Sequence, residues 1–323
     1  MKHLQNRMGF ALLACLLGAA LTPLAHAQTS DGEVHILPLQ GNTYMLVGAG
    51  GNITVQVGRD GVLIVDTGLA NMSDKVLAAI KKLSDKPLRY IINTHYHADH
   101  TGGNQALRKA GSTIAGGNVA GDLGAAASEG AQIIASEAVL NRMSAPTGKE
   151  APTPAGGWPT DTFIDEEKKL FFDGEGIEII HMPNAHTDGD SIVFFRRSDV
   201  IATGDLFTTT DYPIIDTAAG GTINGLLDAV NKICDMVIPV YGQEGGTLLV
   251  PGHGRLSEFG DLLNYREMAT ILRDRIQDMI KKGMTLEQVK ATKPTFDYDP
   301  LYGKNPRWTP DMFIEAVYKT LKK

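Results

Sequence analysis

One segment, His-Tyr-His-Ala-Asp-His beginning at His95, constrains this chain more than any other feature of its sequence. Three histidines and an acid within six residues serve no packing purpose, because buried polar side chains need partners. The segment follows directly on an apolar run that predicts a strand. In extended backbone alternate side chains share a face, so His95 and His97 can bind one metal ion. The turn that follows places Asp99 and His100 beside them, suited to a second ion.

The remaining ligands of such a site would have to come from distant parts of the chain. His186, Asp205 and His253 each follow a predicted strand in a turn marked by glycine or proline, where functional side chains are commonly presented. Each residue alone is a weak indication of a metal site, since a lone histidine at a strand end is more often a hydrogen-bonded structural residue. His35 and His181 lack any ligand pattern and are expected to be structural. Imidazole and carboxylate ligands together suit zinc.

Composition excludes two classes of protein. Of the 323 residues, 43% are hydrophobic and 21% are charged, which excludes intrinsic disorder. Thirty Lys and Arg against 37 Asp and Glu give a net charge of −7, so general attraction to nucleic-acid phosphates is not expected. We therefore expect a small-molecule substrate and no nucleic-acid partner.

Residues 1–27 are interpreted as a secretory signal peptide. A basic start, the apolar run Gly9–Leu21 and the small-x-small pattern Ala25-His26-Ala27 are typical of one. The run is shorter than the about 20 residues of a membrane span, so we expect a periplasmic or secreted protein without stable membrane insertion. An uncleaved anchor and lipid attachment at Cys15 are alternatives. Cleavage would leave Cys234 as the sole cysteine, which cannot form an internal disulfide.

The rest of the chain mixes strand and helix patterns. Short β-rich runs predict strands at 43–47, 53–57, 62–65, 88–92, 170–172, 176–181, 191–195, 199–202 and 247–250. Amphipathic or Ala-rich patterns predict helices at 73–83, 117–143, 222–234, 256–282 and 310–322. Ser73 is the expected N-cap of the first helix, and residues 144–160 are expected to form an exposed loop. This order predicts an α+β fold of two sheets packed face to face with helices outside.

In their order and spacing, the ligand segments resemble those of the metallo-β-lactamase superfamily of binuclear metallohydrolases. The resemblance covers roughly residues 34 to 255, and Val65-Asp66-Thr67-Gly68 matches another early feature of that superfamily. It implies a four-layer αββα sandwich over residues 28–255, with the metals at one edge between the sheets. Residues 256–323 would be C-terminal helices that pack on this domain or mediate formation of a homo-oligomer.

The resemblance also implies a role for each candidate ligand. Three histidines would hold the first of two Zn²⁺ ions: His95, His97 and His186. Three residues would hold the second: Asp99, His100 and His253. Asp205 would bridge the two ions, and Asp66 would orient ligands without contacting metal.

The implied activity is metal-dependent hydrolysis. Two Zn²⁺ ions about 3.5–4 Å apart would generate a zinc-bound hydroxide, which Asp99 would direct as the catalytic residue. Two positions depart from common family patterns: the superfamily's true β-lactamases commonly have Cys where this chain has Asp205, and Ala185 stands where many members have Gly. Asp at position 205 is usual in the glyoxalase II, lactonase and phosphodiesterase branches. We therefore expect hydrolysis of a small amide, lactone or ester, with a β-lactam as one candidate substrate.

The sequence also offers candidate substrate contacts and is compatible with two other function classes. Three aromatic residues are candidates for the border of the site opening: Trp158, Phe207 and Tyr212. Ordinary surface loops explain them equally well. The chain can alternatively be a mononuclear-iron enzyme resembling persulfide dioxygenases, or a non-catalytic periplasmic accessory protein. The complete set of seven ligand positions argues against both alternatives, and metal analysis distinguishes the first.

Overall fold

The computed structural model describes residues 32–113, 130–145, 151–238 and 245–322. The expected signal peptide over 1–27 lies outside the described residues, as does the first half of the helix expected at 117–143. Among the described residues, no helix combines the length and apolar composition that a membrane crossing requires.

The first sheet has seven strands in the order β1 to β7, which is also their order along the chain. Its strands are β1 (His35–Pro38), β2 (Thr43–Val47), β3 (Ile53–Val57), β4 (Val62–Val65), β5 (Leu88–Ile92), β6 (Gln132–Ser136) and β7 (Asp161–Phe163). Strands β1 to β4 pair antiparallel, whereas β4 to β7 pair parallel. The β-branched runs between glycines therefore form β2, β3 and β4 with the predicted bounds.

Two local predictions in this half of the chain are wrong. The Ala-rich segment 117–143 is not continuously helical, because Gln132–Ser136 forms β6 beside β5 and only Glu137–Ser144 forms a helix, α5. Apolar contacts inside the sheet outweigh the helix propensity of the neighbouring alanines. Ser73 is the first residue of α1 (Ser73–Leu83) rather than its N-cap. A short 3₁₀ helix, η1 (Ala70–Met72), precedes α1, and the Ser73 hydroxyl donates to the carbonyl of Ala70.

The second sheet has five strands in the order β12-β11-β10-β9-β8. They are β8 (Glu167–Phe172), β9 (Glu175–Met182), β10 (Asp190–Phe195), β11 (Val200–Thr208) and β12 (Leu248–His253). All pairs are antiparallel except β11 with β12, which is parallel. An apolar cluster that includes Met45, Ile92 and Phe195 fills the space between the two sheets.

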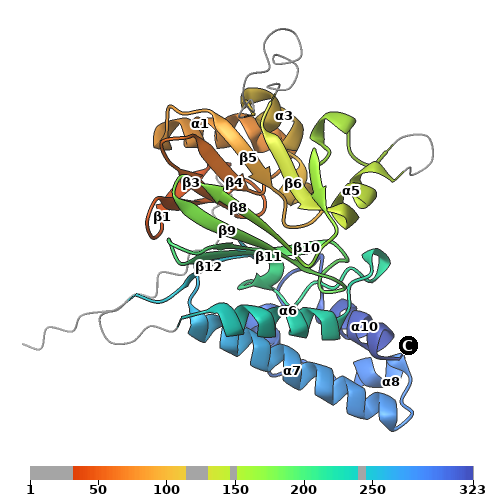
Figure 1. The fold of residues 1–323 in the computed structure, drawn as a ribbon. Helices are drawn as coiled ribbons and strands as arrows, with labels where there is room; N and C mark the ends of the chain where they lie inside the picture. Colours follow the sequence, from red (N-terminus) through yellow and green to blue (C-terminus); the bar gives the residue numbers. More distant parts are fainter. Residues whose placement is uncertain (1–31, 114–129, 146–150, 239–244, 323) are drawn as a thin grey trace, which may run out of the picture.

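Helices cover the outer face of each sheet (Figure 1). Helix α1 and α3 (Asn104–Ala110) lie on the first sheet, and α6 (Ile223–Met236) lies on the second. The C-terminal helices α7 (Phe259–Lys281), α8 (Leu286–Ala291), α9 (Asp299–Tyr302) and α10 (Pro310–Leu321) add a further layer beyond α6. The remaining short helices are α2 (Ala98–Thr101), η2 (Ala155–Gly157) and η3 (Thr217–Ala219). This arrangement confirms the expected α+β, four-layer αββα sandwich with a C-terminal helical extension.

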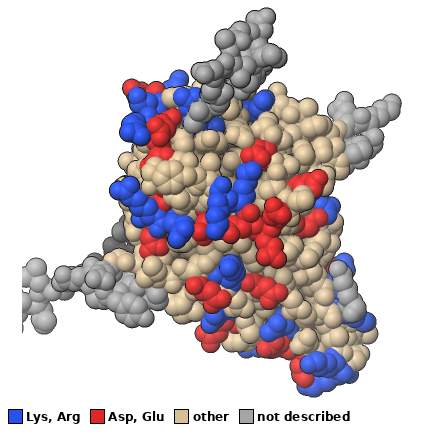
Figure 2. Space-filling model, in the orientation of Figure 1, with Lys and Arg blue, Asp and Glu red and all other residues tan. Residues whose placement is uncertain are grey.

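The face drawn in Figure 2 carries acidic and basic side chains interspersed, without a large area of one sign. Charged side chains pair along β8, and between β9 and the end of β10. Lys169 lies 3.3 Å from Glu167, and Arg196 lies 3.3 Å from Glu178. Charged side chains on an edge strand such as β8 disfavour its pairing with another chain.

Candidate metal centre

The seven candidate ligands come together at one edge of the sandwich, where strands from both sheets end. His95 and His97 follow β5, and His186 follows β9. Asp205 lies within β11, and His253 is the last residue of β12. The ligand atoms form two groups, each within 4.8 Å: His95, His97, His186 and Asp205 in one, and Asp99, His100 and His253 in the other.

Hydrogen bonds from outside the first group fix which nitrogen of two histidines faces inward. His186 Nδ1 lies 2.7 Å from the carbonyl oxygen of Ile214, which can only accept, so this nitrogen carries the proton. His97 Nε2 likewise donates to Asp216 Oδ2 at 3.1 Å. The two unprotonated nitrogens, His186 Nε2 and His97 Nδ1, face each other at 3.0 Å. In neutral imidazoles these two nitrogens carry lone pairs that repel each other unless a cation lies between them, so the pair fits a shared metal ion.

The surroundings of His95 are also those of a metal ligand. The Thr94 hydroxyl donates to Asp66 Oδ2 at 2.7 Å and therefore accepts from His95 Nδ1 at 3.0 Å. His95 Nε2 is left fully buried and without a hydrogen-bond partner among the described residues. Burial, together with the charge of His100, lowers the pKa of His95 well below its ordinary value, so the imidazole is neutral. A buried neutral nitrogen with a free lone pair fits a metal ion.

Asp205 lies between the two groups of ligands. Its Oδ2 is 3.7 Å from His95 Nε2 and 3.6 Å from His186 Nε2. Its Oδ1 is 3.2 Å from His100 Nε2 and 3.5 Å from His253 Nε2. One oxygen thus faces each group, as a bridging carboxylate would.

Two glycines allow the backbone to approach these side chains closely. A Cβ at Gly252 would lie 2.0 Å from Asp205 Oδ1. A Cβ at Gly51 would lie 2.4 Å from the imidazole of His100. Any larger residue at either position would displace a ligand.

Asp66 supports the site without joining either ligand group. Its carboxylate accepts from the backbone N–H of Thr94 at 2.8 Å and contacts His100 Nδ1 at 2.7 Å. These bonds leave His100 Nε2 facing the site. Asp66 itself has φ of 65°, a left-handed conformation that non-glycine residues rarely adopt, and its three partners hold it there.

The charges of the cluster shift the pKa values of its members in opposite directions. Burial opposes ionisation of Asp205, but the positive charges of His100 and His253 outweigh burial and lower its pKa well below the usual range. Burial also opposes protonation of His100, but Asp205 and Asp66 outweigh it and raise the pKa of His100. For Asp99, the hydrogen bond with His253 and the charge of His100 outweigh burial and lower the pKa to about 2. The carboxylates are therefore ionised and attract cations.

The site is open on one side. The side chains of Asp99, His97 and His253 are 35%, 27% and 20% exposed, whereas those of His95, His100 and His186 are fully buried. A small molecule can therefore reach the cluster from the side of Asp99.

Asp216 is a supporting residue that was not predicted from the sequence. Its Oδ1 accepts from the N–H groups of Ala218 and Ala219 and caps η3. Its Oδ2 accepts from the Tyr96 hydroxyl at 2.6 Å as well as from His97. The order Asp-Thr-Ala-Ala-Gly indicates a helix cap, but no local pattern shows that the second oxygen reaches a residue far away in the chain.

The three aromatic candidates for substrate contact occupy different places. Phe207 and Tyr212 are buried in the core under the C-terminal helices, which corrects the expectation that they border the opening. Phe207 packs edge-on against Tyr265, and Tyr212 stacks on Phe313. Trp158 is half-buried and packs with Tyr96 on a small apolar cluster of Ala135, Val139 and Met143.

Among the described residues, the other histidine and cysteine side chains, those of His35, His181 and Cys234, lie outside the cluster. His181 Nε2 contacts the carbonyl of Asp188 at 2.9 Å. Cys234 packs at the margin of the core between the second sheet and the C-terminal helices.

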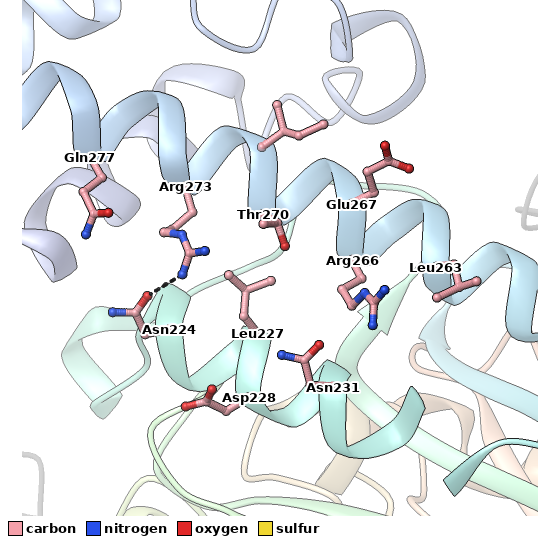
Figure 3. Close-up of a pocket in the computed structure, with 11 residues that line it drawn as sticks. Asn224, Leu227, Asp228, Asn231, Leu263, Arg266, Glu267, Thr270, Arg273 and Gln277 are labelled. Atoms are coloured by element: carbon pink, nitrogen blue, oxygen red, sulfur yellow. Dashed lines mark hydrogen bonds between the residues drawn. The ribbon is translucent and has the colours of Figure 1, made fainter. Parts of the chain in front are cut away.

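A polar groove of about 830 Å³ lies between α6 and α7 (Figure 3). Arg273 in this groove points toward Asn224, 3.3 Å away, and none of the candidate ligands lines it.

Two characterised relatives are similar in sequence to most of the chain. A linear primary-alkylsulfatase from Pseudomonas sp. (strain ATCC 19151) is 26% identical over 273 residues, which cover 75% of this chain and 50% of that protein. A type 2 metallo-β-lactamase from Bacillus sp. (strain 170) is 22% identical over 205 residues, which cover 63% of this chain and 66% of that protein. The chain thus spans half to about two thirds of the length of these relatives.

Solved structures share the fold. A metallo-β-lactamase from Pontibacter korlensis superposes with a TM-score of 0.56 at 16% identity, covering 74% of this chain and 99% of that one. The inverting sec-alkylsulfatase Pisa1 from Pseudomonas sp. superposes with a TM-score of 0.60 at 16% identity, covering 88% of this chain and 50% of that one. The family model of the metallo-β-lactamase superfamily matches residues 40–264. The resemblance inferred from the ligand segments is therefore confirmed, and the chain belongs to the metallo-β-lactamase superfamily.

Proposed function

We propose that this protein is a metal-dependent hydrolase that binds two Zn²⁺ ions and cleaves a small amide, lactone or ester. The observation that carries the proposal is the Asp205 carboxylate, with one oxygen toward each ligand group. The orphaned nitrogen of His95 and the facing lone pairs of His97 and His186 support a metal in the first group. Imidazole with carboxylate is a ligand set that suits zinc.

The chain's own residues prepare the site for hydrolysis. Bound Zn²⁺ would supply a Lewis acid and lower the pKa of a coordinated water toward about 7. Asp99 is ionised at neutral pH, because its pKa is lowered to about 2 by His253 and His100 against the effect of burial. One of its oxygens lies 3.1 Å from His253 Nε2. The other oxygen can accept a hydrogen bond from the attacking water and fix its direction.

Asp66 and Asp216 hold ligand imidazoles in place before substrate arrives. Each carboxylate binds the ring nitrogen opposite the one that faces the site, in His100 and His97 respectively. Such partners fix the ring orientation and raise the basicity of a ligand. A preorganised site of this kind needs no rearrangement as the bond is cleaved.

Two substrate classes follow from the relatives. The relation to a type 2 metallo-β-lactamase supports a β-lactam or another small cyclic amide or lactone. The relation to a linear primary-alkylsulfatase supports a sulfate ester as a second candidate substrate. Trp158, beside Tyr96, is the aromatic residue we propose as a contact for the organic part of the substrate.

A panel of substrates tests this proposal. The zinc-loaded protein is assayed with a chromogenic cephalosporin, a homoserine lactone, a medium-chain alkyl sulfate and a phosphodiester. We expect turnover of at least one of the first three, with loss after chelator treatment and recovery on adding Zn²⁺. The His97→Ala variant is the matched control and should be inactive. Turnover of none of the first three substrates, or turnover that the chelator does not affect, would contradict the proposal.

We further propose that the protein acts in the periplasm or outside the cell, because its first 27 residues fit a signal peptide. Expression of the full chain followed by fractionation tests this. The mature protein should begin at Gln28 in the periplasmic or extracellular fraction. An N-terminus at Met1 in the cytoplasmic fraction would refute export.

A further inference from the structure

Residues 209–216, which we call the ligand-support segment, connect β11 to η3 and touch both the metal site and the C-terminal helices. The segment contains no helix or strand. Because the segment has no regular backbone hydrogen bonding of a helix or sheet, the groups that surround it set its position. Those groups lie on two sides of the segment.

On the side of the site, the end of the segment binds two ligand histidines. The carbonyl of Ile214 accepts from His186 Nδ1 at 2.7 Å, and the N–H of Asp216 donates to the carbonyl of His186 at 2.9 Å. The Asp216 carboxylate accepts from His97 Nε2 at 3.1 Å. Movement of the segment would therefore turn both imidazoles.

On the opposite side, Tyr212 fixes the segment to the C-terminal helices. Its ring stacks on Phe313 of α10, with centroids 4.9 Å apart and an interplanar angle of 11°. Its hydroxyl lies 2.8 Å from Asp299 Oδ1 and 3.1 Å from the carbonyl of Thr295. Its backbone N–H donates to the carbonyl of Tyr302 at 3.3 Å. The tyrosine is fully buried, so these partners exclude water from it.

A second contact lies one residue further along the segment. Trp308, in the loop between α9 and α10, donates from Nε1 to the carbonyl of Pro213 at 3.2 Å. Proline lacks an N–H, so its carbonyl is its only hydrogen-bonding group. Tyr212 and Pro213 are thus held from the C-terminal side, immediately before Ile214 binds His186.

We propose that the C-terminal helices position His97 and His186 for metal binding, and that Tyr212 and Trp308 are the positioning residues that act through the ligand-support segment. The inference rests on the proposed metal binding of the first ligand group. It gives the C-terminal extension a role in the metal site, although none of its residues is a candidate ligand.

Conservative variants test the inference in the full-length protein. Tyr212→Phe keeps the stacked ring and removes the hydroxyl, and Trp308→Phe removes the N–H. Tyr318→Phe is the matched control, because it removes a hydroxyl bond to the carbonyl of Met284 within the same extension. Zinc affinity is measured by competition with a chelating indicator. We expect the Tyr212→Phe/Trp308→Phe variant to bind one Zn²⁺ about tenfold more weakly, at the lower end of what loss of a ligand-orienting contact costs.

A measurement on the metal-free protein separates this inference from the proposed function. Histidine-selective ¹⁵N NMR reports the tautomer of each imidazole. In the double variant we expect changes at His97 and His186, with His181 unaffected and with the Tyr318→Phe spectrum like that of the wild type. Wild-type protein that binds no zinc would refute the proposed function, and the NMR comparison would still decide the positioning role. Unchanged His97 and His186 signals, or equal changes in the control, would overturn the inference.

Discussion

Replacing Asp216 by asparagine should weaken metal binding through His97, although Asp216 is not itself a candidate ligand. The His97 hydrogen bond holds the pKa of Asp216 well below its usual range, so the carboxylate is charged. The asparagine oxygen can still cap η3 by accepting from Ala218 and Ala219. Its NH₂ group would then face His97 Nε2 and favour the tautomer with the proton on Nδ1. That nitrogen faces His186 in the site and would no longer be free to bind metal.

Two independent estimates give a similar magnitude for the loss of zinc affinity in Asp216→Asn. A hydrogen bond to a charged group contributes about 1.5–3 kcal/mol. Removal of a group that orients a metal ligand typically costs about 10–100-fold in metal affinity, which corresponds to about 1.4–2.8 kcal/mol. We therefore expect the zinc dissociation constant of the first ligand group to rise about 10–100-fold in Asp216→Asn.

Competition of metal-depleted protein with a chelating zinc indicator measures this constant. Asp188→Asn is the control, because Asp188 pairs with Arg142 at 2.7 Å and its side chain has no ligand histidine among its hydrogen-bond partners in the described residues. The control should bind zinc within about twofold of the wild type. An Asp216→Asn constant equal to that of the wild type, or an equal loss in both variants, would refute the reasoning.

Three further predictions follow from other parts of the structure. His97→Ala or Asp205→Ala should remove nearly all hydrolytic turnover while the far-ultraviolet circular dichroism spectrum keeps its native form; full activity of either would exclude the metal mechanism. Tyr265→Phe should leave stability unchanged or raise it by up to about 1–3 kcal/mol in urea unfolding, because the buried hydroxyl has no hydrogen-bond partner among the described residues; a clear loss would show that the hydroxyl is satisfied. Glu315→Gln should destabilise the protein slightly at neutral pH but not near pH 2. The hydrogen bonds from Lys290 and Lys319 lower the pKa of Glu315 to about 2, so their contribution to folding stability is lost as pH falls from about 4.5. A loss of stability of the same size at both pH values would contradict this assignment.

The fold was predictable where local sequence and tertiary packing agree. The β-branched runs that form β2 to β5 are bounded by glycines or follow an amphipathic helix, and packing between the sheets reinforces the strand pattern. Strand β6 was not predictable, because Gln132–Ser136 lies in an Ala-rich stretch and becomes a strand only by pairing with β5. Helix α8 has a local capping box of Thr285 and Gln288, but α8 and α9 also contact the core through Val289 and Tyr302, which local propensity does not reveal.

The candidate site was predictable to the extent that its residues are chemically unusual in sequence. Histidines and acids that follow strands stand out against the apolar strand residues before them, and the structure brings all seven together. Residues that act on the ligands do not stand out in this way. Asp216 has the local pattern of a helix cap, and Tyr212 after Asp205 is equally compatible with a site border or with the core. Their roles depend on contacts with distant segments, which only the folded chain shows.

The number and position of the bound metal ions decide whether the cluster is a binuclear zinc centre. Inductively coupled plasma mass spectrometry of the purified protein, combined with anomalous diffraction at the zinc edge, would count the ions and locate them. We predict two Zn²⁺ per chain, one within His95, His97 and His186, one within Asp99, His100 and His253, and Asp205 between them. A single iron per chain would favour an oxidative enzyme, and protein that holds no metal at these residues would refute the binuclear zinc centre.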